Sequence, residues 1–323
     1  MTHGRSPFAA ATLLLLALCV LNPEAVSAAP LAQAASSLPP PFLPWWAWIG
    51  LLFATTFLIG IVAVLGGVGG GVLFIPIVGT FFPFHADYVR CVGLLIALSG
   101  SLSAGPLLIR RNLANLRLSI PTALIASTAS IFGAHVGLAL PARFIQLATA
   151  ILMSGVLLLL LSAKSSAFPD VPVTDSLGRL LGLGGVYRDD AEGRDVSWKV
   201  RHTAPGFALF ILVGFMAGMF GLGAGWANVP VLNLLMGTPL KIAVATSNLV
   251  IAVSSMTAAW IYINKGALIS VIAVPAIVGM IAGTKIGARL LSKVDSKVVR
   301  KVVLTLLAVS ILLGYFKGFG LIK

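Results

Sequence analysis

The chain has 323 residues, of which 59% are hydrophobic and 10% are charged, and its mean hydropathy is +1.05. Soluble domains carry about 25% charged residues, so this composition excludes a disordered chain, a coiled coil and an ordinary soluble enzyme. The net charge of +13 would suit nucleic acid, but the basic residues follow a membrane topology instead. We therefore expect the chain to sit in a lipid bilayer and to bind no nucleic acid.

Residues 1–34 have the organisation of a signal peptide and leader. Arg5 precedes an apolar run over 8–21, which is short for a membrane span and typical of a signal-peptide core. Small residues that follow would allow cleavage after Ala28 or Ala34. The alternative is an uncleaved anchor, and both interpretations leave the next part of the chain outside.

An internal repeat organises the rest of the chain. Shifted by 154 residues, the sequence aligns with itself without a gap. The matched glycines and prolines include Gly67, Gly69, Gly71 and Pro76, which fall on Gly221, Gly223, Gly225 and Pro230. Chance matches of leucine and valine are expected in a membrane protein, but matched glycines and prolines at one offset are not. We predict an all-α polytopic membrane protein with a tandem repeat, 45–161 and 203–317.

Each repeat contains five apolar segments. In the first repeat they cover 45–66, 71–82, 86–109, 118–140 and 143–161. In the second repeat they cover 204–220, 226–236, 240–263, 268–291 and 297–316. The linker between the repeats, 162–202, holds six basic and six acidic residues. It is predicted to be a solvated loop with one short surface helix.

An odd number of segments per repeat would give the two repeats opposite orientations. With the linker inside the cell, 16 basic residues lie on the inner side and five on the outer side, Arg5 of the leader being left out. This asymmetry predicts an inverted repeat of about 5+5 transmembrane or partly re-entrant helices in the cell (inner) membrane. The linker would be cytoplasmic and both ends of the mature chain outside. Secondary transporters are commonly built this way, with the substrate near the midplane.

The second segment of each repeat is short and follows a glycine run, "GGVGGGVLFIP" at 66–76 and "GLGAGWANVP" at 221–230. Twelve helical residues cover about 18 Å, which is less than a bilayer core of about 30 Å. Part of each segment is therefore expected to be unwound or re-entrant, with helix N-termini that attract anions. The alternative is that the glycines only allow close packing, as we expect for 133–137, 214–218 and 279–287.

The charges favour an anionic substrate. Outside the leader and the linker, the acidic residues are Asp87 and Asp295, both near segment ends, whereas cation pumps keep carboxylates in mid-membrane. Uncharged donors that could contact an anion are Trp226, Asn228, Asn233, Thr246, Ser247 and Asn248. For Asn228 and Asn233 the alternative is hydrogen bonding between helices. Arg90 either attracts anions at the outer mouth or, the interpretation we favour, snorkels to the membrane surface.

Enzymatic chemistry is not expected. The chain contains no HExxH, GxSxG or Walker sequence, so we predict no catalytic residue, metal or cofactor. The two cysteines lie in apolar stretches and do not suit a disulfide framework or a thiolate metal site. The alternative to transport is an intramembrane enzyme or a membrane assembly factor. A hydrolase of that kind would need a Ser–His pair or paired aspartates within the membrane.

The paired glycine-rich segments, together with "GTPLKIAVATSNLVI" at 237–251, resemble the TauE/SafE sulfite exporter family over about 48–316. The resemblance implies transport of small sulfur-containing anions such as sulfite, sulfonates or sulfoacetate. The first repeat departs from it, because Val92, Gly93 and Leu94 stand where the second has Thr246, Ser247 and Asn248. The predicted substrate-binding residues are Gly69, Gly70, Gly71, Pro76, Gly223, Ala224, Gly225, Asn228, Pro230, Thr246, Ser247 and Asn248. The sequence indicates no oligomeric state.

Overall fold

The computed structural model describes residues 45–66, 69–82, 84–110, 113–162, 169, 171–189 and 194–290, and seven residues between 304 and 316. The leader and most of the predicted segment 297–316 lie outside the described residues. The first half contains α3 (Trp45–Gly66), α4 (Gly70–Phe81), α5 (Ala86–Arg110), α6 (Leu116–Ala139) and α7 (Ala142–Ser162). The second half contains α9 (Thr203–Phe220), α10 (Gly225–Pro230), the π-helix η2 (Val231–Leu235), α11 (Leu240–Asn264) and α12 (Ser270–Leu290).

The structure is mostly helical, as predicted. With α10 and η2 taken together, the described membrane helices begin and end within two residues of the segments expected from hydropathy. Six of them, α3, α5, α6, α9, α11 and α12, are apolar and long enough to cross a membrane. The chain is therefore a multi-pass membrane protein.

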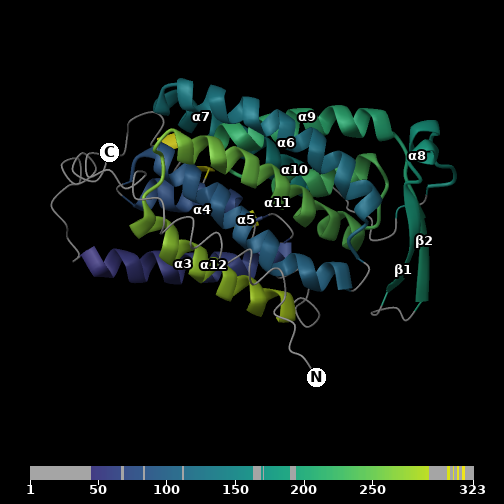
Figure 1. Ribbon diagram of the computed structural model, residues 1–323, viewed down its shortest axis with the longest axis horizontal. Coiled ribbons are helices and arrows are strands. Elements are labelled where there is room, and N and C mark those ends of the chain that lie inside the picture. Colours follow the sequence, from purple (N-terminus) through teal and green to yellow (C-terminus); the bar gives the residue numbers. More distant parts are fainter. Residues whose placement is uncertain are drawn as a thin grey trace.

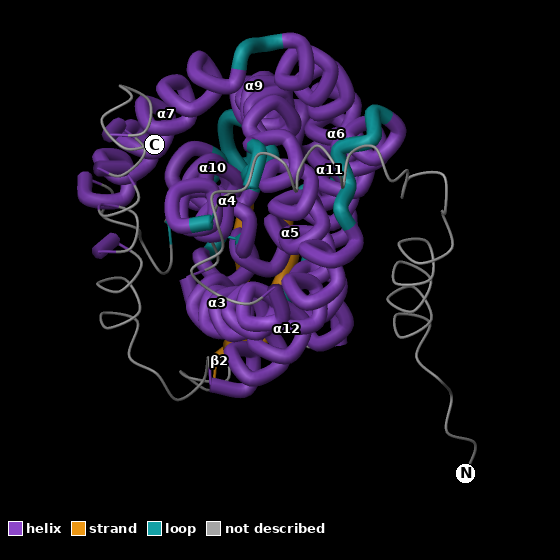
Figure 2. Tube along the Cα trace, turned by 90° about the vertical axis from the view of Figure 1, so that its left-hand side faces the viewer, coloured by secondary structure: helices purple, strands orange, loops and turns teal. Residues whose placement is uncertain are grey.

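The helices pack as two bundles, and each bundle takes a helix from the other half of the chain. The first bundle consists of α3, α4, α5 and α12, and the second of α6, α9, α10, η2 and α11. In Figures 1 and 2, α3 and α12 lie on one side of the molecule and α6 and α9 on the other, with α4, α5 and α10 between them. The bundles meet where α5 packs against α11.

Small residues determine how the outer helices pair. Gly279, Gly283 and Gly287 of α12 lie directly against backbone carbonyls of α3, and a Cβ at Gly287 would come within 2.7 Å of the carbonyl oxygen of Ile61. Gly133 and Gly137 of α6 meet carbonyls of α9 in the same way. These small-residue stretches are packing faces, as predicted.

The two outer pairs repeat each other with the halves exchanged. Gly287 faces the carbonyl of Ile61, and Gly133 faces the carbonyl of Phe215. Gly133 is the repeat equivalent of Gly287, and Phe215 is the repeat equivalent of Ile61, at the offset of 154 residues. The α3–α12 pair and the α9–α6 pair therefore make the same contact at equivalent residues. The repeat seen in the sequence is also seen in how these two helix pairs pack.

The linker differs from the expected solvated loop. It contains the short helix α8 (Ser176–Leu180), as predicted, and an antiparallel hairpin of β1 (Gly184–Asp189) and β2 (Arg194–Lys199). Tyr187 and Trp198 are buried within it, and the register places Arg188 opposite Asp195. The mixed charges of the linker led to the prediction of a solvated loop. In the structure, acidic residues of one strand lie opposite basic residues of the other, Arg188 opposite Asp195 and Asp189 opposite Arg194.

The hairpin is anchored to the second bundle. Tyr187 and Trp198 belong to the same buried cluster as Leu118 of α6 and Phe210 of α9. Asp175 accepts hydrogen bonds from the amide and the hydroxyl of Thr203, at 2.8 and 2.7 Å. Burial of Asp175 acts to raise its pKa, but the bonds from Thr203 and from an adjacent glycine amide outweigh burial and lower it. We call this part of the molecule, on the right of Figure 1, the hairpin end.

Candidate functional site

The two glycine runs meet in the centre of the molecule. Gly69 and Gly223 both have positive φ, 81° and 71°, which only glycine adopts without strain. A Cβ at Gly69 would lie 3.7 Å from the Cα of Gly225, and one at Gly71 would lie 2.5 Å from the carbonyl oxygen of Leu222. Backbone from the first bundle therefore touches backbone from the second, which larger residues would prevent.

Each run leads into a short helix that begins inside the molecule. α4 has 12 residues and α10 has six, and neither N-terminus has a side-chain cap. Pro76 lies within α4, while Pro230 ends α10, and the chain continues as the π-helix η2. A proline has no N–H to donate to the preceding turn, and the wider π-turn follows directly after it. The backbone is thus irregular before each short helix, at Gly69 and Gly223, and again in η2, in agreement with the expectation that part of each segment is not regular helix.

Several buried polar groups on α10 and α11 have no hydrogen-bond partner within the described part of the chain. They are both amide atoms of Asn228, the hydroxyls of Thr246 and Ser247 and the indole N–H of Trp226. Asn228, Thr246 and Ser247 are 0% exposed. An unsatisfied buried polar group costs about 1–3 kcal/mol, so most native proteins pair such groups. A ligand or water would relieve this cost.

A small cleft, with room for a water-sized group, lies at the boundary between the bundles. It is lined by Ala63, Gly69, Gly70, Ala97, Gly100, Ser101, Asn248 and Met280. Seven of these residues come from the first bundle, and Asn248 of α11 comes from the second. The cleft wall contains hydroxyl, amide, thioether and small apolar groups and no charged side chain.

The predicted site residues divide into groups in the structure. Gly69, Gly70 and Asn248 line the cleft, and the amide nitrogen of Asn248 donates to the carbonyl of Val244 at 3.1 Å. The other predicted residues, Gly71, Pro76, Gly223, Ala224, Gly225, Asn228, Pro230, Thr246 and Ser247, are not part of the cleft wall.

Asn233, by contrast, has a structural role. Its side-chain amide donates to the carbonyl of Thr238 at 2.8 Å, in the loop that leads into α11. Asn228, for which hydrogen bonding between helices was the alternative, has no such partner among the described residues. Asn233 therefore holds a turn, whereas the amide of Asn228 has no hydrogen-bond partner in the described part of the chain.

Sequence reasoning missed several polar groups near the centre. The hydroxyl of Ser255 would lie 3.5 Å from a Cβ at Gly223, and that of Thr284 would lie 3.5 Å from a Cβ at Gly100. Both hydroxyls are buried without a partner in the described structure. Ser101 of the cleft falls on Ser255 at the offset of 154, a signal that the sequence contained.

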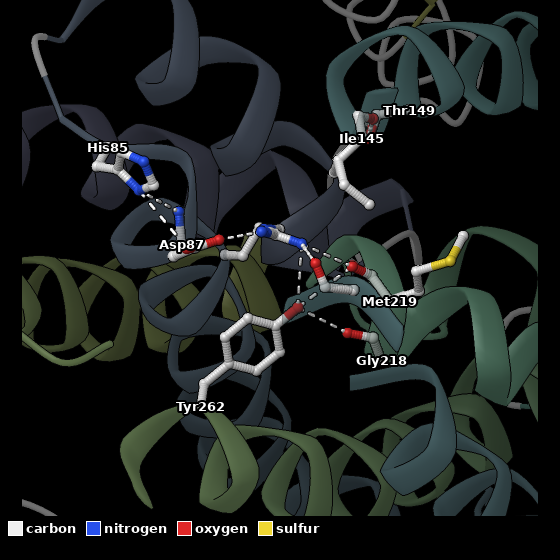
Figure 3. Close-up of polar contacts among 9 residues, drawn as sticks. His85, Asp87, Ile145, Thr149, Gly218, Met219 and Tyr262 are labelled. Atoms are coloured by element: carbon white, nitrogen blue, oxygen red, sulfur yellow. Dashed lines mark hydrogen bonds and ion pairs between the residues drawn. The ribbon is translucent and has the colours of Figure 1, made fainter. Parts of the chain in front are cut away.

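The interpretation of Arg90 as a snorkelling residue is wrong. Its side chain is buried, with the residue 2% exposed, and its guanidinium donates to the carbonyls of Gly137 at 2.9 Å and Met219 at 3.2 Å (Figure 3). It also contacts the hydroxyl of Tyr262 at 3.4 Å and forms an ion pair with Asp87. The guanidinium is already bound to two carbonyls and a carboxylate, so it is not available to bind an anion.

Comparison with known proteins gives two matches. The family model described as Sulfite exporter TauE/SafE matches residues 52–313. The chain is also similar to the Probable membrane transporter protein YunE of Bacillus subtilis (strain 168), with 35% identity over 106 residues. That alignment covers 33% of this chain and 38% of the relative's length. No solved structure matches.

Proposed function

The chain belongs to the sulfite exporter TauE/SafE family of membrane transporters, and on this basis we propose that it is a secondary transporter of a small anion. The substrate class we propose is a sulfur-containing anion such as sulfite, a sulfonate or sulfoacetate. The family match covers both halves of the chain, and the matched relative is named as a membrane transporter.

The observation that carries the anion proposal is the set of unpartnered neutral groups around the glycine runs. Asn228, Thr246 and Ser247 offer an amide and two hydroxyls that no described residue satisfies. Neutral donors bind an anion through hydrogen bonds without an ion pair, which keeps binding reversible. Proton and cation pathways commonly contain carboxylates within the membrane, and none lies near the centre among the described residues.

We propose that the substrate binds where the two glycine runs meet, in contact with the cleft, and that the runs move apart to admit it. The contacts would come from Gly69–Gly71 on one side and Gly223–Gly225 on the other, with Pro76 and Pro230 ending the motifs. Asn228 and the cluster of Thr246, Ser247 and Asn248 would supply hydrogen bonds. The approach of Gly69 to Gly225 supports this arrangement, because it joins the two runs at one place.

The mechanism we propose is alternating access around this site, in a protein built as an inverted repeat. The exchanged register of the α3–α12 and α9–α6 pairs supports the repeat. The excess of basic residues on the hairpin side supports a cytoplasmic hairpin and an outward opposite end. Movement of the first bundle against the second would then expose the cleft to each side in turn.

Counterflow in proteoliposomes tests the proposal. Vesicles that contain the purified chain are loaded with unlabelled sulfite, and uptake of labelled sulfite is followed over time. The same assay is then run with taurine-like sulfonates and with chloride. We expect accumulation of a sulfur-containing anion and none of chloride. Equal uptake in protein-free vesicles would contradict transport, and chloride counterflow alone would contradict the substrate class.

A further inference from the structure

One buried cation links the two bundles at the end of the molecule opposite the hairpin. Arg90 lies near the start of α5, in the first bundle. Its acceptors, Gly137 of α6, Met219 of α9 and the hydroxyl of Tyr262 of α11, all lie in the second bundle. A single side chain of α5 thus joins three helices of the second bundle across the boundary between the bundles.

The acceptors are groups that a helix cannot satisfy by itself. Gly137 lies in the last turn of α6, and Met219 is the residue before the last in α9. Carbonyls in a last turn have no partner within the helix, and a cation there is also favoured by the helix dipole. The hydroxyl of Tyr262 reaches the carbonyls of Gly218 and Met219, at 3.2 Å each. Arg90 and Tyr262 therefore both bind the end of α9.

The backbone at this point is shaped to let Arg90 reach them. Gly221 follows α9 with φ of 72°, and a Cβ there would lie 2.7 Å from the Cβ of Arg90 and 2.8 Å from its carbonyl oxygen. A larger residue at this position would hold α5 away from the end of α9. The close approach of the two bundles and the hydrogen bonds of Arg90 are thus parts of one contact.

The countercharge of Arg90 lies on its own helix. Asp87 is three residues earlier in α5 and 31% exposed, and His85 lies 3.6 Å from its other oxygen. When the bundles separate, Asp87 moves with Arg90. The guanidinium then loses carbonyl acceptors that water can replace, but it keeps its carboxylate. A charge that stays paired makes separation cheaper than the exposure of an unpaired buried cation.

We infer that Arg90 is the latch of this transporter, meaning the side chain whose hydrogen bonds across the bundle boundary hold the end opposite the hairpin closed. This end opens when the guanidinium leaves the carbonyls of Gly137 and Met219 and the hydroxyl of Tyr262. The inference adds a gate to the proposed alternating-access function. Arg90 acts through the positions of helices and does not contact the substrate.

Accessibility of the cleft tests the latch without requiring any transport. The full chain carries Cys19→Ser and Cys91→Ser, and Ser101→Cys places a thiol of similar size in the cleft. A membrane-impermeant maleimide is added to intact cells, and separately to inside-out vesicles. The variants are Arg90→Gln and, as a matched control, Arg110→Gln at the other end of α5.

We expect Arg90→Gln to accelerate labelling from outside by about tenfold, with no change from the hairpin side, and Arg110→Gln to change neither. Tyr262→Phe should give a smaller rise, about threefold, because it removes one partner. Equal labelling of Arg90→Gln and Arg110→Gln would overturn the latch. A rise on both sides would also overturn it, since loss of folding has that effect.

If Arg90→Gln does not accumulate in the membrane, the test rests on Tyr262→Phe. Labelling of Tyr262→Phe from outside at the rate of the parent protein would then refute the inference. A rise confined to inside-out vesicles would support the latch and reverse the proposed membrane orientation. Faster labelling in a protein that shows no counterflow of sulfur-containing anions would support the latch while contradicting the proposed substrate.

Discussion

The first third of α5 and the first third of α11 occupy equivalent places in the two halves but have opposite character. In α5, Val92 and Leu94 are fully buried in apolar packing, and a Cβ at Gly93 would meet Ile75 at 2.8 Å. In α11, Thr246 and Ser247, which are equivalent to Val92 and Gly93, are also buried but have no partner for their hydroxyls in the described structure. The buried side chains therefore only pack in α5, whereas in α11 they include hydroxyls that could still form hydrogen bonds.

The difference suggests that the proposed site is one-sided. Buried hydroxyls without partners reduce stability, so their presence in only one of two equivalent helices calls for a role that the other helix does not have. A binding role for α11 and a packing role for α5 would explain it. The following experiments test this division, from the largest expected effect to the smallest.

Gly225→Leu should abolish transport while the protein still reaches the membrane. The new side chain would occupy the crossing of the two glycine runs, where the backbone of Gly69 already lies against Gly225. Counterflow and membrane accumulation are measured together. Gly50→Leu is the matched control, because a Cβ at Gly50 has nothing within 4 Å. Wild-type transport by Gly225→Leu would show that the run serves packing alone.

Asn248→Ala should weaken binding of the anion, since a hydrogen bond to a charged group is worth roughly 1.5–3 kcal/mol. This corresponds to about ten- to hundredfold in affinity. The control is Leu94→Ala at the equivalent position of α5, which should lower thermal stability without a specific loss of affinity. Affinity is measured from the dependence of counterflow on substrate concentration, and stability is measured by thermal unfolding. Equal loss of affinity in both variants would contradict a one-sided site.

Thr246→Val should reduce affinity for the anion while it leaves thermal stability unchanged or raises it. Valine has the shape of threonine and removes a hydroxyl that has no partner in the described structure. The reverse exchange in α5, Val92→Thr, buries a new unpartnered hydroxyl and should cost about 1–3 kcal/mol. Thermal unfolding in detergent compares the two. Destabilisation by Thr246→Val of the same size would mean that its hydroxyl is already paired.

The smallest effect concerns the hairpin, which lies outside this comparison. The pKa of Asp175 is lowered by folding, so its bonds to Thr203 stabilise the anchored hairpin above the unfolded pKa near 3.8. That contribution is lost as the pH falls through the still lower folded pKa. Asp175→Asn should speed proteolysis of the linker severalfold at neutral pH. Anion affinity should not change, and a change would connect the hairpin with the site.

Much of the fold could be predicted because hydropathy and glycine spacing are local. Long apolar runs indicated the helices, and the breaks at Gly69 and Gly223 follow from a backbone that only glycine adopts easily. The hairpin was missed because its charged residues resemble those of a loop, while the burial of Tyr187 and Trp198 comes from helices elsewhere in the chain.

For the proposed site, the sequence identified polar residues but not the geometry around them. Asn228, Thr246 and Ser247 could be named as uncharged donors in an apolar chain. The rest of the cleft wall beyond Gly69, Gly70 and Asn248 could not be named, because residues such as Ala63 and Met280 carry no chemical signal and reach the cleft only through the packing of α3 and α12. Asn228 and Asn233 look alike in sequence, and only the position of the Thr238 carbonyl separates them.

The sequence by itself determined that this is a membrane protein, where its helices begin and end, and that its halves repeat at an offset of 154 residues. Hydropathy and backbone preference act between neighbours in the chain, so they can be recognised without a fold. The tertiary structure alone decided that α12 packs with α3 and that Arg90 is buried. Its acceptors on Gly137 and Met219 lie 47 and 129 residues away, and only folding brings those helix ends to the guanidinium.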